Sequence, residues 1–138
     1  MDIKNHVELV KVLKEIKRDL HGTHRQFINQ SNAMINHLRL LKLELAYESG
    51  GSNIDTINLL TTSINLINGS LRKTVNEFAP TLHEFRSSIE KVRSEFDKFP
   101  GLTETVLDDI RRVRKDLLDN CWTDVNRVIC EVDEFASE

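Results

Sequence analysis

Five histidines are the residues of this chain that could most readily bind a metal ion or transfer protons. They are His6, His21, His24, His37 and His83. A carboxylate-bridged di-metal site in a helical bundle uses Glu-x-x-His on facing helices, and none of these histidines has glutamate three positions earlier. His21 and His24 share one helix face and could hold a single metal ion with His83, but two histidines at this spacing are usually solvated. We therefore expect no metal and no other cofactor.

The two cysteines, Cys121 and Cys130, lie nine residues apart on one expected helix. That spacing separates them by roughly 13 Å, which is too far for a disulfide bond. Neither belongs to a CxxC motif, and we expect both to be small buried apolar residues. Free cysteines favour a reducing compartment. The charged amino terminus, Met1–His6, does not resemble a secretory signal, so we expect a cytoplasmic protein.

Sequence motifs for catalysis are absent. The chain has no GxSxG, GxxxxGK[ST], GxGxxG or HExxH segment. Acidic neighbours such as Asp108 and Asp109 diverge around a helix, and a continuous apolar seam predicts a filled core rather than a concave pocket. We expect a protein that is not an enzyme and has no small-molecule substrate.

Charge also limits the partners. The chain has 19 basic and 22 acidic residues and a formal net charge of -3. Its densest basic run, from Arg111 to Lys115, is flanked by aspartates, and we expect Asp108 to pair with Arg112 and Asp119 with Lys115. A self-neutralised run does not favour nucleic acid, and no expected helix has the basic face or apolar length that a membrane requires.

The elements that position these residues are three long helices. Glycine and proline cluster only at Gly50–Gly51 and Pro100–Gly101, which predicts helices over approximately 3–48, 53–99 and 102–136. Apolar residues recur at alternating spacings of three and four in each helix, as in a coiled coil. We expect an all-α fold, an elongated antiparallel three-helix coiled-coil bundle forming one domain over residues 1–138.

Each apolar seam contains one irregularity, in which two spacings of four follow each other. The central residues of these irregularities are Phe27, Leu71 and Cys121. In an up-down-up bundle they fall near one level, where the helices must unwind together to stay packed. Pro80 lies inside the second seam without changing its phase, which predicts a kinked continuous helix. The alternative is a break at Pro80 and a four-helix bundle.

Two helix faces could bind a partner. The segment from Thr56 to Leu71 contains no charged residue, and its Leu59, Thr62, Ser63 and Leu66 lie off the main seam. Because charges are depleted in interface cores, this face would suit contact with another helix. A neutral, solvated face is the alternative.

The second candidate face is on the third helix and consists of Leu118, Trp122 and Ile129. It contains the chain's only tryptophan, a residue type that is enriched in binding hot spots. A wider core would also explain these residues, because each helix of a bundle buries about three positions in seven.

These observations predict a non-catalytic interaction module of the adaptor or scaffold type. It would bind a helical protein, or itself as an oligomer, through the two faces. The alternative is a secretion-associated helical protein, either an export substrate or its chaperone.

Overall fold

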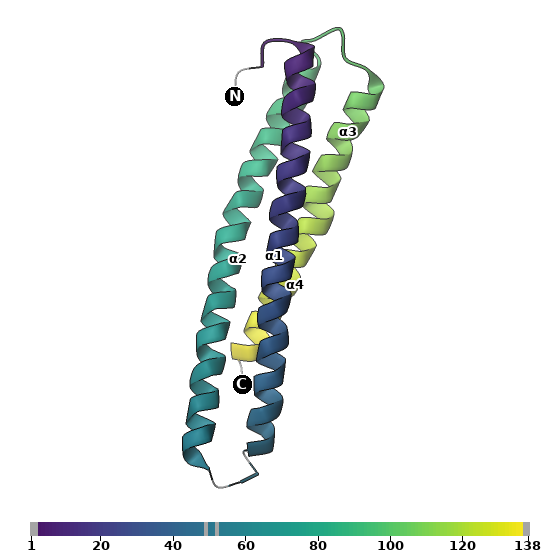
Figure 1. Cartoon of the computed structure of the whole chain (residues 1–138). Coiled ribbons are helices and arrows are strands. Elements are labelled where there is room, and N and C mark those ends of the chain that lie inside the picture. The colour runs from purple at the N-terminus through teal and green to yellow at the C-terminus, as the bar shows by residue number, and fades with distance from the viewer. Residues whose placement is uncertain (1–2, 49, 52, 137–138) are drawn as a thin grey trace. The chain divides into compact units, whose positions relative to one another are not determined.

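The structure is a computed structural model that describes residues 3–48, 50–51 and 53–136 (Figure 1). Its helices are α1 (His6–Glu48), α2 (Ile54–Phe96), α3 (Glu104–Lys115), the π-helical segment η1 (Asp116–Cys121) and α4 (Trp122–Ala136). No strand occurs within the described ranges. The all-α fold predicted from the sequence is confirmed.

Asparagine caps set the beginnings of the two long helices. The side-chain oxygen of Asn5 accepts a hydrogen bond from the backbone N–H of Glu8 at 2.9 Å, and that of Asn53 accepts one from Thr56 at 3.2 Å. These bonds satisfy N–H groups that have no partner within the helix. The first helix therefore begins three residues later than the sequence pattern predicts.

The contacts divide the chain into two compact units, each containing parts of all three helical stretches. Unit 1 contains residues 1–25 and 78–124, and unit 2 contains residues 26–77 and 125–138. In α1 and α2 the division falls close to the seam irregularities, and in the third stretch it falls just after η1. The expectation of a single domain stays a prediction.

Unit 1 packs the first part of α1 against the second part of α2 and against α3 and η1. His6 lies against Gly101, where a Cβ atom would approach the imidazole ring to 3.2 Å, and His24 stacks on Phe78 with ring centroids 6.3 Å apart. The first part of α1 therefore runs antiparallel to α2 and parallel to α3, as the up-down-up arrangement requires. The buried core is Ile3, Leu9, Leu13, Ile16, Leu20, Phe78, Leu82, Ile89, Val92, Leu107, Ile110, Val113, Leu117 and Cys121.

Unit 2 packs the remainder of α1 and α2 with the residues of α4 that begin at Val125. Arg39 binds Glu131 at 2.9 Å, and Arg127 donates to Asn32 at 3.4 Å, so α1 and α4 run in the same direction. The buried core is Phe27, Ser31, Ile35, Leu38, Leu60, Ile64, Leu71, Val75, Val125, Val128 and Val132. The side chain of Phe135, which the seam predicts to be buried, lies outside the described residues.

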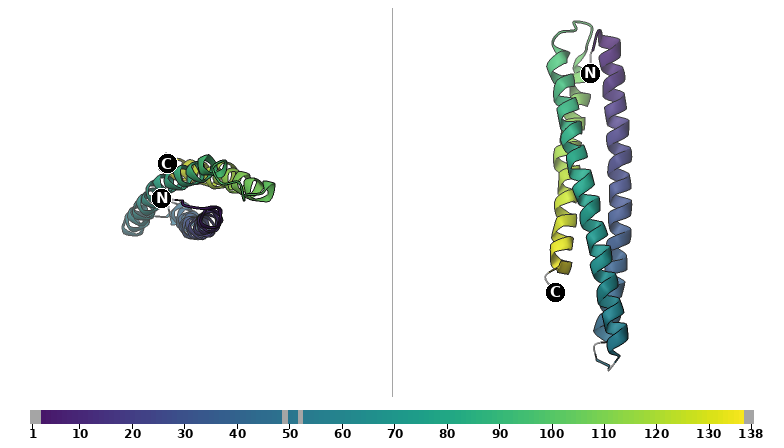
Figure 2. Two further views of the ribbon diagram at one scale, coloured as in Figure 1. Left: turned by 90° about the horizontal axis from the view of Figure 1, so that it is seen from above. Right: turned by 90° about the vertical axis from the view of Figure 1, so that its left-hand side faces the viewer.

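The hairpin end of unit 2 extends beyond the last described residue of α4 (Figures 1 and 2). The seam residues Leu41, Leu45 and Ile57 are consequently only half-buried, because two helices shield a seam less completely than three. The sequence pattern does not show this difference, since the apolar spacing continues into the turn.

The third helical stretch contains a π-helical segment that the sequence analysis did not predict. The backbone N–H of Trp122 donates to the carbonyl of Leu117, five residues earlier, which is the hydrogen bond of a π-helix. The wider turn keeps residues four apart on one face, and Leu117, Cys121 and Val125 are all buried. The doubled spacing in this seam therefore has a backbone cause.

The second helix continues through Pro80, so the four-helix alternative is wrong. Proline has no N–H to donate to the carbonyl of Asn76 and its ring crowds the preceding turn. Pro80 is exposed, where solvent can hydrate the carbonyl that lacks an intrahelical partner. Packing of the apolar seam on both sides of the proline holds the helix together.

Replacing Pro80 by alanine should stabilise the protein, because the missing hydrogen bond is restored. We expect Pro80→Ala to raise the free energy of unfolding by about 1–3 kcal/mol. Urea denaturation followed by circular dichroism measures this change. An unchanged or lower stability would show that packing around α2 requires the proline geometry.

Candidate functional site

The outward face of α2 in unit 2 exposes two large apolar side chains. Leu59 is 67% exposed and Leu66 is 68% exposed. Thr62 between them is also exposed, whereas Ser63 is half-buried. The structure therefore places Leu59, Thr62 and Leu66 on one accessible stripe, with Ser63 at its margin.

The threonine hydroxyls near this stripe are already hydrogen-bonded within the helix. Thr61 Oγ1 donates to the carbonyl of Ile57, and Thr62 Oγ1 donates to the carbonyl of Asn58, both at 2.9 Å. Such bonds to the carbonyl four residues earlier satisfy the hydroxyl donors without solvent. A partner could cover this face without leaving those donors unpaired, which lowers the cost of removing water.

The residues of the second predicted face are more buried. In unit 1, Leu118 is 38% exposed, and the Trp122 indole packs on the His83 ring with centroids 5.0 Å apart. In unit 2, Ile129 is 39% exposed. Leu118 and Ile129 are thus exposed, although less so than Leu59 and Leu66, whereas Trp122 is half-buried. The burial of Trp122 favours the wider-core explanation for this residue over a free binding anchor.

Other exposed apolar residues were missed by the sequence analysis. In unit 2 these are Leu40, Leu43, Tyr47 and Ile54, each at least 65% exposed. The sequence does contain a pattern that indicates this exposed surface. Leu40, Leu43 and Tyr47 are spaced three and four residues apart on the side of α1 opposite the buried seam. Together with Leu59 and Leu66, these four residues place six exposed large apolar side chains in the hairpin part of unit 2.

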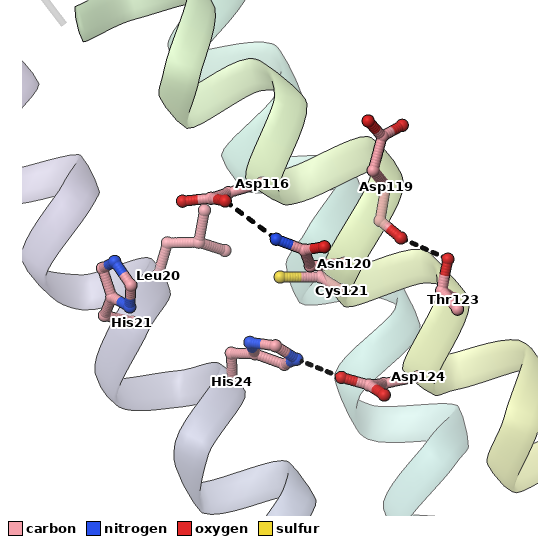
Figure 3. A pocket seen from close by; sticks show the side chains of 9 residues that line it. All are labelled: Leu20, His21, His24, Asp116, Asp119, Asn120, Cys121, Thr123 and Asp124. Carbon is pink, nitrogen blue, oxygen red and sulfur yellow. Dashed lines mark hydrogen bonds and ion pairs between the residues drawn. The ribbon is translucent and has the colours of Figure 1, made fainter.

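A pocket of about 370 Å³ lies in unit 1 between α1 and the π-helical region (Figure 3). His24 points across it, and Asp116 and Cys121 project towards α1, whereas Asp119 and Thr123 point away. The continuous apolar seam predicts a filled core rather than a concave pocket. The seam residues Leu117 and Cys121 are buried as predicted, but a pocket is present beside them. Four of the residues that line the pocket, Asp116, Asp119, Asn120 and Cys121, belong to the π-helical segment η1.

The main polar contact of this pocket joins His24 to Asp124. The imidazole Nε2 lies 2.7 Å from the carboxylate Oδ2, and the two side chains are 19% and 25% exposed. With Phe78 stacked on the same imidazole, this contact fixes the ring between α1 and α4. His24 is thus a packed, hydrogen-bonded residue rather than a solvated one.

The buried cysteine in the pocket is a poor nucleophile. Burial, with the nearby carboxylates of Asp116 and Asp124, raises the pKa of the Cys121 thiol to about 12. The thiolate is the reactive form of cysteine, so Cys121 is almost entirely protonated at neutral pH. The expected burial of Cys121 is confirmed, but that of Cys130 is wrong because Cys130 is exposed.

Of the three histidines considered for a metal ion, His21 and His24 line the same pocket and His83 does not. His24 binds Asp124, and His83 packs on Trp122. Among the residues that the structure describes, no group of three or more histidine, cysteine or acidic side chains could hold a metal ion.

The basic run of α3 is paired differently from the prediction. Arg111 binds Asp108 at 3.3 Å and Arg112 binds Asp109 at 3.9 Å, each three residues apart. Arg114 reaches across unit 1 and donates two hydrogen bonds to the carboxylate of Glu90 on α2. These bonds lower the pKa of Glu90 and raise that of Arg114. The run is neutralised partly by a contact between helices.

None of the described helices combines the length and apolar character needed to cross a membrane. Comparisons with protein families, curated proteins and solved structures found no match to this chain.

Thiol labelling should distinguish the two cysteines. At pH 8, a pKa of about 12 leaves roughly one Cys121 in ten thousand as thiolate. We expect iodoacetamide to add one label to the native protein, at Cys130, and two labels in denaturant, as counted by mass spectrometry. The matched Cys130→Ser variant should remain unlabelled until unfolded, and rapid native labelling of that variant would contradict the burial of Cys121.

Two leucines of α2 should differ strongly in their effect on stability. Leu71 is fully buried, and Leu71→Ala should lower the free energy of unfolding by about 2–5 kcal/mol. Leu66→Ala should change it by less than about 0.5 kcal/mol at low protein concentration. Denaturant titrations of both variants test this difference. A large loss for Leu66→Ala in dilute protein would show that its side chain is packed within the monomer.

Proposed function

We propose that this chain is a non-catalytic helical interaction module that binds another helix through the outward face of α2 in unit 2. The observation that carries this proposal is the exposure of Leu59 and Leu66 at 67% and 68%. Both lie within sixteen consecutive uncharged residues. Large apolar residues on an otherwise uncharged face mark interaction sites more often than ordinary solvated surface.

The helix itself supports this role. Threonine, serine, asparagine and glycine are mediocre helix formers, and ordinary solvated helix faces use lysine and glutamate to favour solubility. On this face, residues whose hydroxyls bond to the helix backbone stand in place of lysine and glutamate. This composition favours a face that a binding partner covers. The free thiols of Cys121 and Cys130 are consistent with an adaptor that works in the reducing cytoplasm.

Site-specific photocrosslinking tests this function whatever the identity of the partner. A benzophenone amino acid replaces Thr62, between the two leucines, in the cells that make the protein. We expect a discrete adduct of defined mass, and we expect it to disappear in the Leu59→Lys, Leu66→Lys double variant because two buried charges would oppose the contact.

The matched control places the same amino acid at Lys17, an exposed charged position of α1 in unit 1. It should give no adduct of that mass. Equal labelling at both positions, or no adduct at Thr62, would contradict a binding role for this face.

A further inference from the structure

A second heptad pattern runs along the outward side of α2, separate from the buried seam. It consists of Asp55, Leu59, Thr62, Leu66, Gly69 and Lys73, which we call the outer seam. Its spacings alternate strictly between four and three, as in a coiled-coil interface. All six residues belong to unit 2 and all are exposed.

The outer seam faces away from the core of unit 2. The buried residues of the same helix segment are Leu60, Ile64, Leu71 and Val75. At 100° per residue, the outer seam lies on the opposite side of the helix from these positions. The third helical stretch therefore does not cover it, and the seam is available to a separate chain.

Close packing within the described chain does not require glycine at Gly69. A Cβ atom at this position would meet nothing within 4 Å, yet glycine inside a helix costs about 1 kcal/mol relative to alanine. A residue without a side chain at a seam position allows a large side chain of another helix to approach closely.

The outer seam is complementary to itself when two copies run in opposite directions. In antiparallel coiled coils each a position faces a d position of the partner helix. With Ile64 at the level of a two-fold axis, Leu59 faces Gly69 and Thr62 faces Leu66 of the second copy. Each large side chain then meets a smaller one, which is the arrangement that packs a helix interface without voids.

The charges at the two ends of the seam select the same arrangement. Asp55 and Lys73 are equally distant from Ile64 in the sequence, so each carboxylate faces the ammonium group of the other copy in an antiparallel pair. A parallel pair in register would place like charges together. Lys73 also lies 4.0 Å from Glu77 in its own helix, but both side chains are exposed and such pairs hold side chains weakly.

We propose that the outer seam binds the outer seam of a second copy of this chain, giving an antiparallel two-fold dimer. This inference rests on the proposed function and names the partner. Because one surface patch meets itself, the interface closes at two copies. The remaining apolar residues of the hairpin stay outside the contact.

The size of the seam sets the strength of this dimer. The chain has 8761 Å² of accessible surface, and a standard interface covers roughly 800 Å² on each partner. One stripe of about five helical turns covers less than this. We therefore expect a dimer that dissociates in the micromolar range and is monomeric in dilute solution.

Sedimentation equilibrium with charge-reversed variants tests both the partner and its direction. Asp55→Lys and Lys73→Asp should each weaken dimerisation about tenfold, because attraction becomes repulsion at two symmetric positions. The double variant Asp55→Lys, Lys73→Asp should restore it, since opposite charges meet again. Lys17→Asp, with the same charge change as Lys73→Asp but outside the seam, should have no effect. Circular dichroism of every variant checks that the helices remain folded.

Disulfide trapping gives an independent measurement of the register. In a Cys130→Ser background, with copper phenanthroline as oxidant, a mixture of Thr62→Cys and Leu66→Cys chains should give mixed dimers. Each variant alone should crosslink much less. Crosslinking of each variant with itself but not with the other, or no rescue by the double charge reversal, would overturn the antiparallel register.

A chain that remains monomeric at about 1 mM would overturn the dimer altogether. If the Thr62 photocrosslink then gives an adduct with a different protein, the proposed function stands and only its partner is changed. If that adduct is also absent, both the dimer and the proposed function fail.

Discussion

The constraint on which the rest of this structure depends is that three apolar seams must keep the same phase along three helices. Each seam doubles a spacing of four once, and in α1 and α2 the α-helix continues through this change with Phe27 and Leu71 still buried. In α4 and the preceding segment the π-helical turn of Asp116–Cys121 absorbs the change. In α2 the helix also continues through Pro80, with Phe78 and Leu82 buried on either side of it.

The pocket of unit 1 lies beside the π-helical segment of the third helical stretch. The π-helical segment and α1 surround a small space that holds the His24–Asp124 contact and the buried Cys121. These residue types are familiar in catalytic sites, but their surroundings oppose nucleophilic chemistry by the thiol. Burial keeps Cys121 protonated, and Phe78 and Asp124 hold the imidazole in a packed position.

The outward face of α2 in unit 2 differs from ordinary helix surfaces because its exposed apolar residues stand among uncharged ones. Leu59 and Leu66 are exposed between threonine and asparagine residues rather than between lysines and glutamates. The only charges on the outer seam, Asp55 and Lys73, stand at its ends and have opposite signs. Burial of the two leucines would favour association of this face with a partner. The opposite charges at its ends would favour one direction of the partner helix.

The sequence by itself determined the helix class, the two turns and most of the core, because apolar spacing and Gly or Pro pairs are local signals. It also showed the uncharged face around Leu59 and Leu66. Only the tertiary structure decided that Trp122 packs on His83, that Arg114 binds Glu90 and that Cys130 is exposed. Those outcomes depend on which helices lie beside each residue and how far the third one extends. Spacing along one chain records which residues share a face, but the neighbouring helix decides whether that face is covered.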